Sequence, residues 1–253
     1  MDYELQKASL WKRIAAWLFD LILAGILAVG IAALLSAAVG YDKHSDAVSE
    51  AYARYEAEYG ITFEVSGEEY QSWPEEKKQA YDEAYKALTA DEQAMYSYNM
   101  VVNLTMLVTS LSILAAVVAL ELVVPLLLKN GQTLGKKIFA LCVVRQDCVR
   151  VNGLQIVART ILGKFAVETM VPVYILLMLF WGITGLPGTV ILLALLLAQI
   201  IILLVTRRNA AIHDLLAGTA VADYSGQRIF GSEAELTEYV KRIHAERAAR
   251  QEY

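Results

Sequence analysis

Residues 12–20 read Lys-Arg-Ile-Ala-Ala-Trp-Leu-Phe-Asp, and they open an almost uncharged stretch that runs to Val39. A helix needs roughly 20 apolar residues to cross the hydrocarbon core of a bilayer. The apolar region of a cleaved signal peptide has only about 7 to 15 residues, so this stretch is too long for one. We therefore predict a retained transmembrane helix over residues 12–39.

Two further apolar stretches follow, in a chain of 253 residues whose mean hydropathy is +0.44. Val101 to Leu128 suffices for one crossing, whereas Phe165 to Val205 is long enough for two. Gly182, Gly185 and Pro187 interrupt the longer stretch and favour a turn there. The prediction is an all-α membrane protein with four transmembrane helices, at about residues 12–39, 98–128, 164–182 and 187–206.

Charge is distributed unevenly between the segments that join these helices. Residues 41–92 hold fourteen acidic and five basic side chains, whereas residues 129–164 hold one acidic and seven basic side chains. Basic segments stay on the cytoplasmic side of a membrane. We therefore expect the basic segment and both termini in the cytoplasm, and residues 41–97 outside it as a helical insertion.

The polar segments have recognisable internal patterns. Two apolar runs, Ile138–Val144 and Ile156–Phe165, are flanked by cations, which suits cytoplasmic segments that lie in the membrane interface or re-enter it. Ser232 and Glu235 have the spacing of a capping box, and the helix they predict mixes both charges, unlike a nucleic-acid-binding patch. The expected organisation is a membrane domain of residues 10–222, the insertion of residues 41–97 within it, and a cytoplasmic C-terminal helix in residues 225–253.

Tyrosines recur at helical spacing in the insertion. Tyr52, Tyr55 and Tyr59 belong to one such series, and Tyr81 and Tyr85 belong to a second. Aromatic residues at this spacing are most often packed between helices. We expect the two helices of the insertion to pack on each other, with binding of a ligand or partner as the alternative.

Ionisable side chains within the predicted transmembrane helices are costly in hydrocarbon. Arg13 and Asp20 lie seven residues apart, on one face of the first helix. Glu121 and Glu168 lie near the predicted cytoplasmic ends of the second and third helices. We expect these side chains to gather in the cytoplasmic half of the bundle, where a proton relay, a cation site or a buried salt-bridge network would each require them.

The basic segment begins with a loop rich in glycine and lysine. A Walker motif has four residues between its glycines and a serine or threonine after its lysine, whereas this loop has three residues between the glycines and a second lysine after the first. That mismatch excludes a nucleotide site of the Walker type. The candidate residues of the loop are Gly131, Gln132, Thr133, Gly135, Lys136 and Lys137.

The sequence gives no positive sign of a metal, a cofactor or an enzyme. Cys142 and Cys148 have a spacing that fits neither a zinc site nor a redox motif. No nucleophile and base occur at a recognisable spacing. We therefore expect no catalytic residue, no cofactor, no metal ligand and no nucleic-acid partner.

Three motifs occur in a fixed order: the stretch at residues 12–20, the loop at residues 131–137, and His-Asp-Leu-Leu-Ala-Gly-Thr at residues 213–219. Together they resemble the RDD family of bacterial membrane proteins. The resemblance implies that Arg13, Asp20 and Asp214 are the arginine and two aspartates after which the family is named. It also implies a bacterial plasma membrane location, and it adds Arg159, where members usually have an arginine, to the expected polar cluster. The insertion is longer here than in short members.

Two functions fit these features. The first is a small secondary transporter or ion/proton exchanger that works around Asp20, Glu121 and Asp214 on small cations. Four helices enclose a pathway poorly, so this function predicts a homo-oligomer. The second is a non-transporting membrane module that binds an anionic lipid headgroup through Lys136, Lys137, Arg159 and Arg207, or that scaffolds a partner protein.

Overall fold

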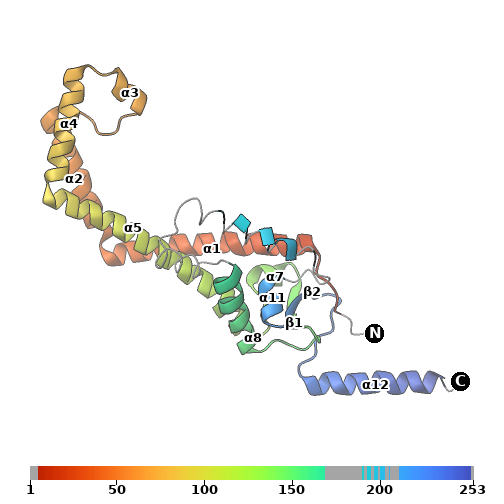
Figure 1. Ribbon diagram of the computed structural model, residues 1–253. Helices are drawn as coiled ribbons and strands as arrows, with labels where there is room; N and C mark the ends of the chain where they lie inside the picture. Colours follow the sequence, from red (N-terminus) through yellow and green to blue (C-terminus); the bar gives the residue numbers. More distant parts are fainter. Residues whose placement is uncertain are drawn as a thin grey trace. The chain divides into compact units, whose positions relative to one another are not determined.

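The computed structural model describes residues 5–168 and 211–251, together with residues 190, 193–194, 197–198, 200–202 and 205 (Figure 1). The predicted helices at 164–182 and 187–206 therefore fall mostly outside the described residues. The chain divides into two compact units, one of residues 1–24 and 117–253 and the other of residues 25–116. Each unit is described by itself.

The described part of the chain is mostly helical. Its elements in chain order are α1 Leu10–Val39, α2 Tyr41–Tyr59, α3 Gly67–Ser72, α4 Glu75–Ala90, α5 Glu92–Val118, η1 Ala119–Val123, α6 Val124–Leu127, α7 Leu134–Ile138, β1 Leu141–Arg145, α8 Gly153–Val157, η2 Ala158–Glu168, α11 Ile212–Leu216, β2 Thr219–Asp223 and α12 Glu233–Gln251.

Two helical stretches are long and apolar enough to cross a membrane, by length and composition. They are α1, with a mean hydropathy of 2.6, and the continuous stretch Glu92–Leu127, with a mean hydropathy of 2.5. They correspond to the first two predicted transmembrane helices. Large apolar side chains on both stretches remain exposed, among them Leu34 and Met106, as expected for surfaces that face lipid.

The second of these stretches is irregular at its end. Its segment η1 is π-helical and precedes Pro125 in α6. Proline has no backbone N–H to donate to the carbonyl four residues earlier, which is that of Glu121. The hydroxyl of Thr160 donates to this carbonyl instead, at 3.1 Å. The irregularity therefore has a local cause and is compensated by a contact from η2.

A two-stranded sheet corrects the all-α prediction. β1 and β2 pair antiparallel, with Val143 opposite Val221 in the register. The first four residues of each strand are buried, so within the apolar run Ile138–Val144 the residues Leu141–Val144 pack inside the protein rather than against the membrane interface, whereas Ile138 is exposed. β-branched side chains favour a strand, and the partner strand lies beyond the predicted third and fourth helices, where a local pattern gives no sign of it.

The sheet forms the core of its unit. Leu141 and Val221 pack with Ala8 and with Ala16 of α1. The thiols of Cys142 and Cys148 are buried on and beside β1. At the C-terminal end, Ser232 accepts a hydrogen bond from the backbone N–H of Glu235, which confirms the predicted start of α12.

Residues 41–97, the predicted insertion, are largely helical, and some of their aromatic residues pack on one another. Phe63 makes edge contacts with Tyr52 and Tyr81, with ring centroids 5.2 Å and 5.6 Å apart. α2 and α4 are in contact. The stretch between them contains a short helix, α3, that sequence patterns did not predict; the side chain of Ser66 accepts the hydrogen bond that caps it.

Candidate functional site

Asp20 holds the glycine-rich loop against α1. Its side chain is buried and accepts two hydrogen bonds, one from the hydroxyl of Thr133 at 2.5 Å and one from the backbone N–H of Gly135 at 2.7 Å. Thr133 also caps α7 by accepting from the backbone N–H of Lys136. Both carboxylate oxygens of Asp20 are therefore used to fix the start of α7.

Gly135 allows this close approach. A Cβ atom at this position would lie 2.9 Å from Cγ of Asp20 and closer still to the carbonyl oxygen of Ala16. Real Cβ contacts are essentially never this short, and a backbone carbonyl cannot move aside as a flexible side chain can. Glycine at this position is thus a requirement of the contact between the loop and α1.

Asp214 is the centre of a second buried group. Its Oδ1 atom accepts from Nε of Arg159 at 2.9 Å and from the hydroxyl of Thr219 at 3.1 Å. Nη2 of Arg13 lies 3.5 Å from Oδ2. Burial raises the pKa of this carboxyl, but the charges of Arg159, His213 and Arg13 outweigh it and hold the pKa well below its usual range.

The segments that bring this group together pack closely. A Cβ atom at Gly163 of η2 would lie 2.5 Å from Cα of His213 in α11. His213 is buried, and its Nε2 atom lies 2.9 Å from Nη2 of Arg159. The absence of a side chain at Gly163 therefore lets α11 approach η2 closely enough for Arg159 to reach Asp214.

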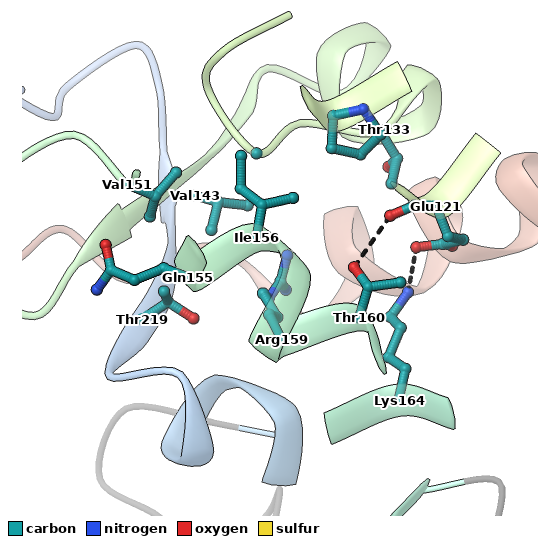
Figure 2. Close-up of a pocket in the computed structure, with 12 residues that line it drawn as sticks. Glu121, Thr133, Val143, Val151, Gln155, Ile156, Arg159, Thr160, Lys164 and Thr219 are labelled. Atoms are coloured by element: carbon teal, nitrogen blue, oxygen red, sulfur yellow. Dashed lines mark hydrogen bonds and ion pairs between the residues drawn. The ribbon is translucent and has the colours of Figure 1, made fainter. Parts of the chain in front are cut away.

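Glu121 forms an ion pair with Lys164. Figure 2 shows this ion pair beside the hydrogen bond from Thr160 to the backbone of Glu121. Both side chains are about four-fifths buried. The π-helical segment η1 thus presents its carboxylate to a lysine of η2.

Lys136 differs from the other cations of the site. Its ammonium group lies 3.2 Å from the hydroxyl of Thr133, and within the described residues it forms no ion pair with a carboxylate. Burial and the charge of Lys164 lower its pKa from 10.5 to about 7, although Glu121 acts in the opposite direction. The ammonium form of this side chain is therefore disfavoured, because its surroundings do not fully balance its charge.

Most of the charged side chains of these groups, but not Asp214, line one pocket of about 400 Å³ between α1, η1, α7, η2, α11 and the two strands. Its charged lining consists of four cations and two carboxylates: Arg13, Lys136, Arg159, Lys164, Asp20 and Glu121. The remaining lining is mostly apolar and includes Leu10, Ile14 and Trp17 of α1. The pocket thus combines an excess of positive charge with an apolar wall.

A smaller cavity of about 10 Å³ adjoins the same charged groups (Figure 2). It has room for about one water molecule. Glu121, Arg159 and Lys164 line both this cavity and the larger pocket. These three side chains therefore lie between the two spaces.

The residues of the predicted polar cluster fall into separate groups in the structure. Arg13, Arg159 and Asp214 interact directly, whereas Asp20 contacts the loop rather than an arginine. The side chain of Glu168 and the whole of Arg207 lie outside the described residues.

The loop residues have separate roles. The side chain of Gln132 donates to the carbonyl of Leu141 at 2.5 Å, Gly131 adopts a left-handed conformation with a φ of 68°, and Lys137 is exposed. Gln132, Gly131 and Gly135 thus determine the conformation of the loop. Of the loop residues, only Lys136 lines the pocket.

Sequence reasoning missed Lys164, His213 and Thr219 as members of the site. His213 adjoins Asp214 in the third motif, so its position was a usable signal. Within the described residues no group of three or more histidine, cysteine or acidic side chains is arranged to hold a metal ion.

Comparison with known proteins gives one match. The family model described as the RDD family matches residues 7–218. This range includes every residue of the charged pocket named above. No curated protein and no solved structure has significant similarity to the chain.

Proposed function

The chain belongs to the RDD family of membrane-associated bacterial proteins, and from this premise we propose that it is a non-enzymatic integral membrane protein that binds an anionic lipid headgroup in the 400 Å³ pocket. The observation that carries the proposal is the excess of cations over carboxylates in the pocket lining. Lys136 contributes most to this excess because it has no carboxylate partner among the described residues.

The carboxylates of the site favour an anion over a cation as ligand. Asp20 accepts from the loop, Asp214 accepts from Arg159, and Glu121 pairs with Lys164. A cation entering the pocket would have to displace these donors, each of which would then be left buried without its partner. An anion can bind Lys136 without breaking any of these pairs.

The apolar wall favours a lipid over a soluble anion. Leu10, Ile14 and Trp17 belong to α1, which is apolar enough to cross a membrane. A lipid presents its charged headgroup and its acyl chains side by side, which matches a pocket with cations on one wall and apolar side chains on the other. Basic pockets at the cytoplasmic leaflet recognise anionic lipids in this way.

The proposed orientation places the pocket and both termini in the cytoplasm and the insertion outside. It rests on the basic and acidic segments on either side of the second apolar helix. Single cysteines at Ser66 and Asn152, in a chain whose two native cysteines are replaced, test it. An impermeant thiol reagent added to intact cells should label the first and not the second; the reverse pattern contradicts the orientation.

Titration of the purified full chain with phosphatidylglycerol and phosphatidylcholine, followed by native mass spectrometry, tests lipid binding. We expect preference for the anionic lipid. The substitution Lys136→Gln should weaken that binding at least about tenfold, because a hydrogen bond to a charged group contributes about 1.5 to 3 kcal/mol. The exposed neighbour Lys137→Gln is the matched control and should bind nearly as the unaltered chain does.

Competition with glycerol 3-phosphate separates a lipid from a soluble anion. Displacement of the lipid only at large excess supports the lipid as ligand, because the soluble compound lacks the acyl chains. Equal affinity for both identifies a soluble phosphate ester instead. Equal lipid binding by Lys136→Gln and Lys137→Gln contradicts the proposal.

Secondary transport or ion/proton exchange is the second candidate, favoured by the π-helical segment η1. Such irregularities inside a helix frequently occur at functional sites, and this one carries Glu121, which faces the pocket. Transport by so few helices would require a homo-oligomer. Cation or proton flux in proteoliposomes, lost in both Asp20→Asn and Glu121→Gln, supports this candidate; lipid binding without flux supports the first.

A further inference from the structure

A second pocket lies within the unit of residues 25–116, well away in sequence from the motifs of the family. It has a volume of about 130 Å³ and is lined by Val48, Ala51, Tyr52, Tyr85, Leu88, Thr89, Ala94, Met95 and Tyr98. No charged side chain belongs to this lining. Its character is therefore aromatic and apolar, in contrast to the acidic segment around it.

Three tyrosines from three different helices converge on this pocket. Tyr52 belongs to α2, Tyr85 to α4 and Tyr98 to α5. Burial raises the pKa of the Tyr52 hydroxyl, and the neighbouring hydroxyls of Tyr98 and Tyr85 raise it further. The three side chains are therefore directed toward a common space.

These tyrosines are not explained by packing alone. Their side chains remain 36%, 54% and 45% exposed, respectively. Within the described residues, none of their three hydroxyls makes a hydrogen bond, and neither Tyr85 nor Tyr98 stacks on another ring. Tyr52 stacks on Phe63, whereas the ring faces of Tyr85 and Tyr98 have contact surface that no other described ring covers.

The neighbouring aromatic residues show what such rings bind in this insertion. The ammonium group of Lys77 lies 3.8 Å from the ring centroid of Trp73, and the guanidinium of Arg54 lies 4.9 Å from that of Tyr55. Each is a cation held against an aromatic face. No described lysine or arginine occupies the corresponding position at Tyr85 or Tyr98.

The charge of the segment favours the same class of ligand. Residues 41–92 hold fourteen acidic and only five basic side chains. A negative field of this kind raises the local concentration of cations and speeds their encounter with the surface. From the convergent tyrosines and this field we infer that the pocket binds a small organic cation of the quaternary ammonium type.

The chemistry of such an ion fits the lining. Its charge is spread over methyl groups, so it can leave water at a small cost and contact the faces of several tyrosine rings at once. A metal ion instead favours carboxylate, amide, imidazole or thiolate ligands, and no side chain of these kinds belongs to the lining. The apolar side chains of Leu88 and Met95 suit the methyl groups.

Calorimetric titration of the full chain, in nanodiscs of phosphatidylglycerol, tests the inference. Choline is compared with 3,3-dimethylbutan-1-ol, which has the same shape without the charge. We expect saturable binding of choline and at least about tenfold weaker binding of the neutral compound, since contacts between a cation and aromatic faces reach about 2 kcal/mol when desolvated. Equal binding of the two compounds, or saturable binding of neither, would overturn the inference.

Tyrosine variants locate the binding. Tyr85→Ala and Tyr98→Ala should each weaken choline binding by roughly 2- to 30-fold, while Tyr98→Phe, which keeps the ring, should bind nearly as before. Tyr96→Ala is the matched control, because Tyr96 lies on the same helix and is exposed but does not line the pocket. Equal affinity of Tyr96→Ala and Tyr98→Ala would contradict the site.

The cation could be free or could belong to a lipid headgroup. Repeating the titration in nanodiscs that contain phosphatidylcholine separates these sources. Loss of the choline signal in those nanodiscs identifies the lipid headgroup as the ligand, and an unchanged signal identifies a free cation. Either result supports the site, provided that Tyr98→Ala abolishes the difference between choline and its neutral analogue.

Discussion

The pocket lined by Arg13 and Arg159 and the pocket lined by Tyr52 and Tyr98 differ in how their side chains are held. In the first, buried charges compensate one another, and glycines let the backbone approach closely. In the second, exposed rings converge without hydrogen bonds among the described residues. The first should therefore be sensitive to single substitutions, whereas the second should tolerate them structurally and lose only binding.

The largest effect is expected from removal of the carboxylate of Asp214, which balances the charges of Arg159 and Arg13. Asp214→Ala leaves Arg159 buried opposite Arg13 without its carboxylate, and loss of one partner of a buried pair costs about 3 to 5 kcal/mol. We expect a large drop in folded yield and in the midpoint of thermal unfolding, measured by fluorescence-detected size exclusion.

The double variant Asp214→Leu with Arg159→Met is the control for this prediction. It removes both members of the pair, so it should recover part of the lost stability. A double variant less stable than Asp214→Ala would show that the pair is not what the single change disrupts.

The next largest effect is expected from a substitution at Gly135, where the loop lies close to α1. Gly135→Ala places a methyl group against the carbonyl of Ala16, and overpacking of this kind typically costs about 1 to 3 kcal/mol. Gly67→Ala, in the insertion, is the matched control because no atom lies within 4 Å of its added Cβ. Equal unfolding midpoints of the two variants would contradict the described contact between the loop and α1.

The third effect concerns pH. Because the pKa of Lys136 falls from 10.5 to about 7 in the folded chain, the unfolded chain binds more protons between these values. The charged amine of Lys136 therefore lowers the stability of the fold in full below about pH 7. This loss of stability disappears as the pH rises toward 10.5. Lys136→Met should flatten the dependence of the unfolding midpoint on pH in this window, relative to Lys137→Met.

A bound anion sharpens this test. An anion beside Lys136 favours the charged amine and raises its pKa, so the pH dependence of stability should weaken when anionic lipid is present. Thermal unfolding in phosphatidylglycerol and phosphatidylcholine micelles measures the difference. An identical pH profile in both lipids would argue against contact between the headgroup and Lys136.

The smallest expected effect comes from a helical ion pair in residues 41–97, in which one of the two side chains is largely exposed. Lys78 and Glu75 are three residues apart on α4, and their side chains are 24% and 91% exposed. Such helical pairs contribute about 0.2 to 0.5 kcal/mol. Lys78→Gln should therefore change the unfolding midpoint far less than Asp214→Ala. A comparable loss would mean that exposure does not distinguish the two regions.

Sequence patterns predicted the parts of the site that rest on local rules. The buried acids Asp20 and Glu121 stood out because each interrupts an apolar helix, and the family motifs identified Asp214. The partners of these acids could not be predicted in the same way. Lys164 pairs with Glu121 across 43 positions of sequence, and the bond from Gly135 to Asp20 joins residues 115 positions apart.

The sheet was missed for a related reason. β1 is a short apolar run, and such a run is ambiguous until its partner is known. That partner, β2, follows the predicted third and fourth helices, so no hairpin turn indicates it. The tyrosine spacing indicated a packed aromatic ring at Tyr52, which contacts Phe63. The pocket between α2, α4 and α5 depends on how the three helices are arranged, and no sequence pattern indicates such an arrangement.

The pairing of β1 with β2 sets an order of events during synthesis. Residues 146–218 separate the strands, so β1 leaves the ribosome first and stays unpaired while this intervening segment is made. The sheet can close only when β2 has followed. In the predicted topology of four transmembrane helices, closure of the sheet therefore requires that the intervening segment has come back to the same side of the bilayer. In that topology, a chain that made one crossing too few would leave β1 as an open edge, the kind of surface that favours aggregation and proteolysis.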